Sequence, residues 1–267
     1  MKELLKRSMT GIIYVFLLLA ATHLSSDAFN FLFLIFGLIC IFEFKKIINL
    51  KGYYVFVVYL FLWWIFIYFT IHSDVIDLLL GLCCATNIFL IVNLFNPRPN
   101  NRSKAQMFFV TLFYIGGGSI FLTMIPYQVN HFAELLIIGI FILIWVNDSF
   151  AYLVGKTIGK HKLFERISPK KTIEGTLGGL VFALIAAYIL ARCSGELNMI
   201  RWLILAVVVV IAGSLGDLIE SMFKRIAGVK DSGTILPGHG GLLDRLDSLI
   251  FAAPFIYLTL QIFGYVS

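Results

Sequence analysis

The most informative stretch of the chain lies within residues 205–257, LAVVVVIAGSLGDLIESMFKRIAGVKDSGTILPGHGGLLDRLDSLIFAAPFIY. Two long apolar runs are joined there by a polar block, 221–248, with four Lys or Arg residues and three aspartates around a glycine-rich turn. The apolar runs predict membrane-spanning helices, because a helix needs about 20 apolar residues to cross the hydrocarbon core. A membrane protein has no packing reason to gather so many charges in one place. The block is therefore predicted to bind phosphates and a hard metal ion.

Composition places the chain in the membrane class. Of 267 residues, 60% are hydrophobic and 13% charged, whereas soluble domains have about 25% charged residues. The four cysteines lie in or beside apolar runs without a CxxC pair, so neither a zinc site nor a disulfide framework is expected. The net charge of +6 resides in short loops between apolar runs. Membrane orientation and phosphate binding explain it, and no nucleic-acid partner is expected.

The hydropathy pattern predicts an all-α integral membrane protein, a polytopic bundle of about nine transmembrane helices. The N-terminus, MKELLKR before an apolar run, resembles a secretory signal. A second apolar run follows almost at once, which favours an uncleaved first helix. The predicted spans are approximately 8–25, 28–44, 53–71, 75–95, 106–125, 133–154, 175–193, 200–219 and 248–266.

Loop charges predict the orientation. With the N-terminus inside and the C-terminus outside, every basic residue except Arg192 and Arg201 falls on a cytoplasmic segment. The polar site is then expected at the cytoplasmic face. Residues 1–135 are predicted to be scaffold and lipid-facing helices. Residues 136–267 are predicted to be the catalytic region, with cytoplasmic loops 155–174 and 220–247.

Two aspartates lie within apolar runs, where a charge is costly unless it is paired, hydrated or metal-bound. Asp148 follows FILIWVN, and Asp217 lies near the cytoplasmic end of the eighth predicted span. A structural partnership with a neighbouring helix is the alternative for each. Asp217 shares one predicted helical face with Glu220, Ser221 and Lys224, at i, i+3, i+4 and i+7. A solvated helix end would account for Lys224 but not for Asp217.

The turn Pro237–Gly241 contains His239 among three glycines, whose backbone N–H groups can approach phosphate oxygens closely. Alone, His239 would be an ordinary loop histidine; its charged neighbours favour a role beside phosphates. Asp244 and Asp247, at i and i+3, are predicted to open the last helix. Helix capping would need only one of them, whereas a metal ion would explain Asp244 together with Asp217.

The loop 155–175 begins with GKTIGK, which lacks the spacing of a phosphate-binding P-loop. Its later part, SPKKT followed by Glu174, places two lysines and two hydroxyls at the start of the seventh span. This pattern favours polyanion binding. The alternative is a positively charged cytoplasmic loop that ends in a helix start.

Residues 221–247 resemble the signature of the phosphatidate cytidylyltransferases (CDP-diacylglycerol synthases). Three upstream segments resemble the same family: 147–152 (NDSFAY), 168–175 (SPKKTIEG) and 216–221 (GDLIES). The similarity covers roughly residues 145–250. In the signature itself, the matching residues are Ser221, Phe223, Lys224, Arg225, Lys230, Asp231, Gly233, Leu236, Pro237, His239, Gly240, Gly241, Asp244, Arg245 and Asp247.

The resemblance implies the reaction CTP + phosphatidate → CDP-diacylglycerol + diphosphate, a step of phospholipid biosynthesis. It implies CTP and phosphatidate as substrates, the lipid bilayer as surroundings, a homodimer and a bacterial cytoplasmic membrane location. It also implies dependence on Mg²⁺, for which Mn²⁺ can substitute, with room for a monovalent cation such as K⁺.

The residues suit that chemistry. Because the lipid phosphate is already ionised, the enzyme has mainly to bring two polyanions together and stabilise the leaving diphosphate. Asp217 and Asp244 are predicted as metal ligands, and they form the predicted catalytic set with Lys224, Arg225 and His239. The predicted substrate- and phosphate-binding residues are Asp148, Ser168, Lys170, Lys171, Thr172, Glu174, Ser221, Lys230, Asp231, Gly240, Gly241, Arg245 and Asp247.

Two other functions remain open at this point. The same fold would suit a cytidylyltransferase or a kinase acting on an isoprenoid or ether lipid. An ion-coupled transporter would place Asp148 and Asp217 on an ion path. A transporter, however, predicts polar residues in the middle of several helices, and the polar residues here gather at one predicted membrane face.

Overall fold

The computed structural model describes residues 2–69, 71–96, 103–127, 131–236, 238 and 240–266, with side chains from residue 9 onward. His239, predicted as catalytic, lies outside the described residues. In chain order, the helices of the first half are α1 (Lys2–Leu24), α2 (Ser26–Ile47), α3 (Tyr54–Tyr68), α4 (Ser73–Phe95), α5 (Lys104–Val110), the π-helix η1 (Thr111–Gly117) and α6 (Gly118–Met124). The second half contains α7 (Glu134–Ile158), β1 (Lys162–Phe164), β2 (Ser168–Thr172), α8 (Ile173–Cys193), α9 (Met199–Ile226) and α10 (Leu243–Ile262).

Seven helices of the described chain are long and apolar enough to cross a membrane: α2, α4, the continuous segment Lys104–Met124, α7, α8, α9 and α10. Two shorter apolar helices, Met9–Leu24 and Tyr54–Tyr68, coincide with the other two predicted spans. The chain is thus an integral membrane protein, as predicted. The count of nine spans stays a prediction, because it depends on these two shorter helices.

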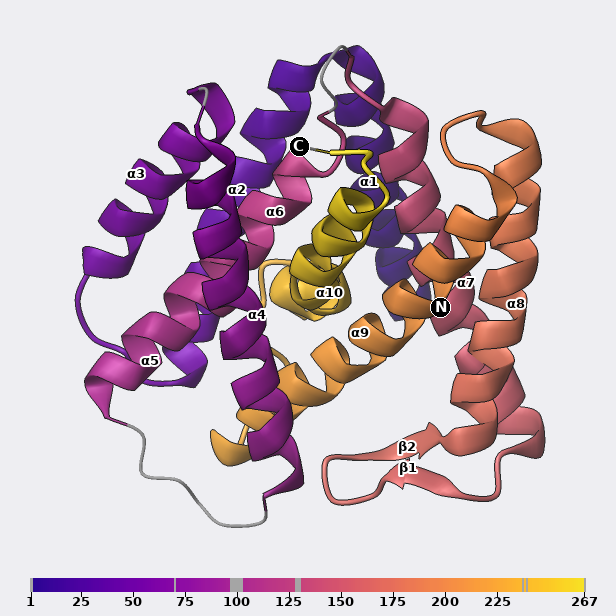
Figure 1. Ribbon diagram of the computed structural model, residues 1–267. Helices are drawn as coiled ribbons and strands as arrows, with labels where there is room; N and C mark the ends of the chain where they lie inside the picture. Colours follow the sequence, from indigo (N-terminus) through magenta and orange to yellow (C-terminus); the bar gives the residue numbers. More distant parts are fainter. Residues whose placement is uncertain are drawn as a thin grey trace.

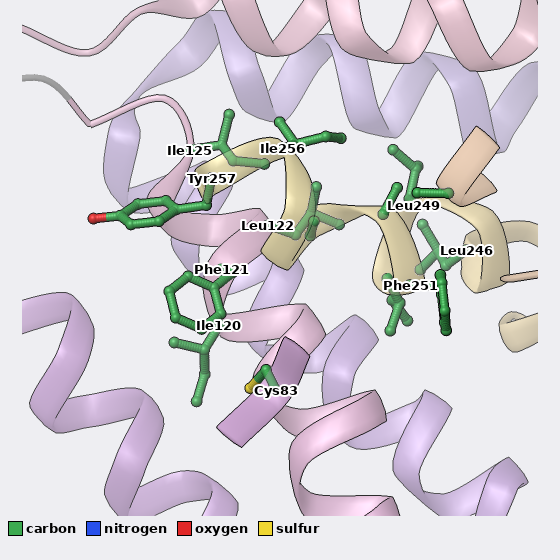
Figure 2. Close-up of a cluster of buried hydrophobic side chains, with 14 of the residues drawn as sticks. Cys83, Ile120, Phe121, Leu122, Ile125, Leu246, Leu249, Phe251, Ile256 and Tyr257 are labelled. Atoms are coloured by element: carbon green, nitrogen blue, oxygen red, sulfur yellow. The ribbon is translucent and has the colours of Figure 1, made fainter. Parts of the chain in front are cut away.

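Helix α10 lies at the centre of the bundle, where it packs against α4, α6 and α9 (Figure 1). Figure 2 shows apolar side chains of α6, among them Phe121 and Leu122, together with Leu249 and Ile256 of α10 in the buried core. Small residues allow this close packing. A Cβ on Gly118 would lie 2.3 Å from the backbone oxygen of Ile250, so α6 and α10 touch backbone to backbone there.

One part of the chain departs from the all-α prediction. Residues 162–172 form an antiparallel two-stranded hairpin, with Lys162 opposite Thr172 and Phe164 opposite Ser168. The hairpin lies at one end of the molecule, beside the ends of α7 and α8 (Figure 1). Its strands contain mostly polar residues without an alternating apolar pattern, so nothing in the loop sequence predicted them.

Helix α9 continues to Ile226, which places Asp217, Ser221 and Lys224 on one continuous helix, as predicted. Helix α10 begins at Leu243, so Asp244 and Asp247 lie in its first turns, also as predicted. The polar segment between these helices is therefore short, and both of its ends are attached to rigid elements.

Candidate active site

A cavity of about 910 Å³ lies where α1, α7, β2, α9 and α10 meet. Its wall carries charges of both signs. The acidic lining residues are Asp148, Asp217, Asp231, Asp244 and Asp247, and the basic ones are Lys156, Lys162, Lys170, Lys171, Lys224 and Arg245. Such a wall suits a ligand that carries several phosphates together with a divalent cation.

Asp217 joins α9 to the hairpin. Its Oδ2 lies 2.6 Å from Nζ of Lys171 on β2, and its Oδ1 accepts a hydrogen bond from the Ser221 hydroxyl at 3.2 Å. The side chains of Asp217 and Lys171 are 36% and 29% exposed. An ion pair that is open to the cavity can exchange partners, so a phosphate can take the lysine and a metal ion can take the carboxylate.

Lys224 is held differently, because it is buried between two carboxylates. Its ammonium forms ion pairs with Glu220, one helical turn earlier on α9, and with Asp244 Oδ1 at 2.6 Å. Glu220 is fully buried. The Lys224–Asp244 pair fastens α9 to the first turn of α10.

Asp244 also organises the chain that precedes it. Its Oδ2 accepts hydrogen bonds from the backbone N–H of Gly241 at 2.7 Å and of Ser232 at 2.9 Å. Gly240 has a φ of +88°, a conformation that favours glycine, and a Cβ there would lie 2.6 Å from Asp244 Oδ2. Two glycines of the predicted turn, Gly240 and Gly241, therefore lie against a carboxylate in this structure.

Asp247 and Asp148 contribute two further carboxylates to the cavity. Asp247 is only 7% exposed, and its Oδ1 accepts a hydrogen bond from the backbone N–H of Ser248 at 2.7 Å. Asp148 Oδ1 accepts from the side-chain amide of Asn147 at 3.2 Å. α7 is brought close to α8 by small residues: a Cβ on Gly179 would lie 2.8 Å from the backbone oxygen of Asn147.

The hairpin is closed by Glu174, in the first turn of α8. Its carboxylate accepts hydrogen bonds from the backbone N–H groups of Lys160 and His161 and lies 2.6 Å from His161 Nδ1. Thr172 caps α8 by accepting from the N–H of Gly175. Arg225 donates to the backbone oxygens of Ile167 and Val229, which ties α9 to the hairpin turn.

The predicted residues thus separate into two groups. Those that line the cavity are Asp148, Lys170, Lys171, Thr172, Asp217, Lys224, Asp231, Asp244, Arg245 and Asp247. Described residues that were predicted for the site but lie outside the lining are Ser168, Glu174, Ser221, Arg225, Lys230, Gly240 and Gly241. Within this second group, Glu174, Arg225 and Gly241 bind the backbone or the carboxylate that holds the site together.

Sequence reasoning did not select four residues that the structure adds. Lys156 and Lys162 line the cavity, and Tyr14 brings α1 to its wall. Glu43 of α2, only 1% exposed, accepts hydrogen bonds from Leu242, Leu243 and Ser232. A lone glutamate inside an apolar run, IFEFKKI, is the signal that could have drawn attention to it.

The donor chemistry fits a hard divalent cation. Within the described part of the chain, no group of three or more His, Cys, Asp or Glu residues is placed to hold a metal ion. Mg²⁺, however, is usually held by one or two carboxylates, with water and substrate phosphates completing its shell. Asp217 and Asp244 line the same cavity and offer such carboxylates.

The fold and the site together define a membrane-embedded protein with a charged cavity suited to phosphates and a divalent cation. The sequence profile of the cytidylyltransferase family matches residues 5–263, and the chain belongs to this family. The chain is 42% identical over 153 residues to a phosphatidate cytidylyltransferase of Staphylococcus saprophyticus, covering 57% of each chain. To the protein of that name in Staphylococcus aureus it is 46% identical over 149 residues, 55% of each chain.

A Staphylococcus epidermidis phosphatidate cytidylyltransferase is 38% identical over 182 residues, which cover 67% of this chain and 68% of the relative. The aligned segments of the first two relatives span only a little over half of their length. The resemblance inferred from the signature residues is confirmed at the level of the family.

Proposed function

We propose that this protein transfers a cytidylyl group from CTP to phosphatidate, which yields CDP-diacylglycerol and diphosphate. The observation that carries the proposal is the composition of the wall of the 910 Å³ cavity. One part is charged, through Lys170, Lys171 and Arg245, and the other part is formed by residues of α1 and α7 such as Val15 and Ile144. A lipid phosphate needs the apolar surface for its acyl chains and the charged surface for its phosphate. The charged surface also suits the phosphates of a soluble nucleotide.

The transfer requires one bond to form and one to break. An oxygen of the ionised lipid phosphate attacks the α-phosphorus of CTP, and the bond from that phosphorus to the β-phosphate oxygen breaks, releasing diphosphate. No strong base is needed, since the attacking oxygen already carries charge. Lys170 and Lys171 on β2 and Arg245 on α10 hold the phosphates in place and offset charge on the leaving group.

Asp217 and Asp244 are the residues that would hold Mg²⁺ in this cavity. A bound Mg²⁺ supplies charge neutralisation to phosphate oxygens and orients them. Asp217 is the more accessible ligand, because its side chain is 36% exposed whereas that of Asp244 is 9% exposed. With Asp217 on such an ion, Lys171 would be available to bind a phosphate.

The proposal includes a location and an assembly. Lysine and arginine residues concentrate at the predicted cytoplasmic ends of the helices, which favours access to CTP from the cytoplasm. Relatives with the phosphatidate cytidylyltransferase name come from bacteria, which favours the bacterial cytoplasmic membrane. A homodimer, a bound K⁺ and the division into a scaffold (1–135) and a catalytic region (136–267) are parts of the same proposal.

The test uses purified full-length protein with Mg²⁺ and CTP labelled at either the α- or the γ-phosphate. With phosphatidate as acceptor, the α-label should enter the lipid fraction as CDP-diacylglycerol, and the γ-label should leave as diphosphate. Entry of the γ-label into lipid would indicate a kinase. Labelling of isoprenoid or ether-lipid acceptors with no labelling of phosphatidate would reject the proposed substrate.

A further inference from the structure

Glu43 is a buried carboxylate far from the signature residues in sequence. It lies in the last two turns of α2 and is 1% exposed. A buried carboxylate is costly unless several donors satisfy it. Three donors do so here: the Ser232 hydroxyl at 3.0 Å, the Leu242 N–H at 3.1 Å and the Leu243 N–H at 2.8 Å. Leu242 and Leu243 directly precede Asp244 in sequence, and Ser232 contacts Asp244 in space.

The two backbone donors belong to the start of α10. The first N–H groups of a helix have no partner within the helix, and this end carries a partial positive charge. Leu242, the residue before α10, has no side-chain cap of its own. Glu43 therefore supplies the cap from another helix, and the partial positive charge of the helix start offsets the charge of its carboxylate.

A second observation comes from the glycines around the carboxylate. A Cβ on Gly233 would lie 2.4 Å from Glu43 Oε1, and a Cβ on Gly241 would lie 2.4 Å from Glu43 Oε2. Neither glycine has a positive φ, so conformational freedom does not explain them. They leave room for Glu43, whose carboxylate the three donors hold in place.

Ser232 connects Glu43 to the proposed metal ligand. Its hydroxyl lies 3.0 Å from Glu43 Oε2 and 3.0 Å from Asp244 Oδ2. The hydroxyl has one hydrogen and can donate to only one of the two at a time. Asp244 Oδ2 already accepts two backbone N–H groups, so Glu43 is the acceptor with greater need of it.

We propose that Glu43 is a positioning residue of the active site: it holds Ser232 and the start of α10 so that Asp244 faces the cavity. The inference rests on the proposed function for its catalytic consequence. Its structural part concerns only the contacts of Glu43 with Ser232, Leu242 and Leu243. Glu43 does not line the cavity, so it acts through Ser232, Leu242 and Leu243 and does not touch substrate.

The test compares Glu43→Gln with Asp27→Asn, which removes a carboxylate charge from an exposed position in the first turn of the same helix. Glutamine keeps the length of the side chain but turns an N–H donor toward one of the backbone N–H groups. Amide hydrogen exchange in purified full-length protein should rise about tenfold in residues 232–243 of Glu43→Gln. Exchange in α3 and α4 should stay at the wild-type rate, and Asp27→Asn should match wild type throughout.

Turnover with CTP and phosphatidate should fall about tenfold or more in Glu43→Gln. Adding Ser232→Ala to Glu43→Gln should lower turnover by much less than it does alone in the wild type, because the two groups act through one contact. A residue that merely stabilised the bundle would give additive losses. If Glu43→Gln fails to fold, Gly233→Ala is the alternative variant. Its added methyl group would collide with the Glu43 carboxylate and should raise exchange and lower turnover in the same way.

Unchanged exchange in 232–243, an equal rise in exchange throughout the bundle, or additive losses with Ser232→Ala would each overturn the proposal. The exchange measurement needs no substrate. If wild-type protein made no CDP-diacylglycerol, the proposed function would fail while the placement of the segment by Glu43 could still be measured.

Discussion

Two lysines that the sequence predicts for the active site, Lys171 and Lys224, have different surroundings. Lys171 pairs with one half-exposed carboxylate, Asp217, whereas Lys224 is 7% exposed and pairs with both Glu220 and Asp244. Removing one partner of a buried ion pair strongly destabilises a protein, because the other charge is left buried without compensation. Lys171 is therefore suited to exchange partners during turnover, and Lys224 to hold α9 against α10.

Asp217→Asn should abolish turnover while leaving the fold intact. The amide keeps the volume but loses the charge that would hold a divalent ion and Lys171, so the rate should fall by about 100-fold or more. The pair is exposed to the cavity, and the thermal midpoint in detergent should change little. Turnover of monodisperse protein is the measurement. Glu165→Gln, at an exposed position of the hairpin turn outside the cavity lining, is the control, and a near-normal rate in Asp217→Asn would contradict the metal assignment.

Asp244→Asn should lose both activity and stability. The substitution removes the charge next to Lys224 and places an amide against the N–H groups of Ser232 or Gly241. Loss of such buried hydrogen bonds costs about 1–3 kcal/mol. A lower thermal midpoint than that of Asp217→Asn is expected, measured under the same detergent conditions. Equal midpoints would indicate that Asp244 does not organise the segment before α10.

At the scale of elements, the packing of α7 against α8 positions Asp148, which lies on α7, and the hairpin, which connects the two helices. Glycines line the contact: a Cβ on Gly175 would lie 2.6 Å from the Ala151 backbone oxygen, and one on Gly178 would lie 2.6 Å from Val154. Close approach of this kind is typical of membrane helices, where small residues let backbones pack. The hairpin then continues from α7 and returns into α8, with Glu174 closing its base.

Gly179→Ala should therefore be harmful, although alanine normally favours a helix by about 1 kcal/mol over glycine. The added methyl would meet Asn147 Oδ1 at 2.5 Å and the Asn147 backbone oxygen at 2.8 Å, beside Asp148. Lower turnover and a lower thermal midpoint are expected. Gly81→Ala in α4 is the matched substitution, because nothing lies within 4 Å of its added Cβ. If the two variants behave alike, helix packing at Gly179 does not position the site.

At the scale of the whole molecule, the charged cavity should make activity depend on a divalent cation. Turnover should vanish in EDTA and return with Mg²⁺ or Mn²⁺, because oxygen ligands and phosphates suit both ions. The measurement is CDP-diacylglycerol formation before and after the ion is restored. Full activity after rigorous chelation would remove the metal role from Asp217 and Asp244.

Orientation is a property of the entire bundle and can be tested with single cysteines. Cysteines at Glu165 and Thr234, both exposed, should react with a membrane-impermeant reagent only from the cytoplasmic side. The native Cys193, exposed at the end of α8, should react from the opposite side. In a protein whose Cys193 is replaced by serine, reaction of Thr234→Cys from outside would contradict both the predicted topology and access to cytosolic CTP.

Local patterns predicted several features correctly. The apolar runs located the helices that can cross the membrane, and the i, i+3, i+4, i+7 spacing placed Asp217 and Lys224 on one helix. The signature residues indicated the family that the profile match establishes. The hairpin was not predicted, because residues 162–172 show no alternating apolar pattern. The contact of Glu174 with the backbone of Lys160 and His161 joins residues 13 and 14 positions apart, which no local pattern predicts.

The sequence alone therefore determined the membrane class, the helical segments, the family and the charged residues near the site, because hydropathy and helical spacing are properties of neighbouring residues. Tertiary structure decided which charges meet. Lys171 pairs with Asp217, Lys224 is enclosed by Glu220 and Asp244, and Glu43 caps α10 from about 200 residues away in the chain. Such partnerships arise only when helices pack, since burial requires each carboxylate to find donors wherever the fold supplies them.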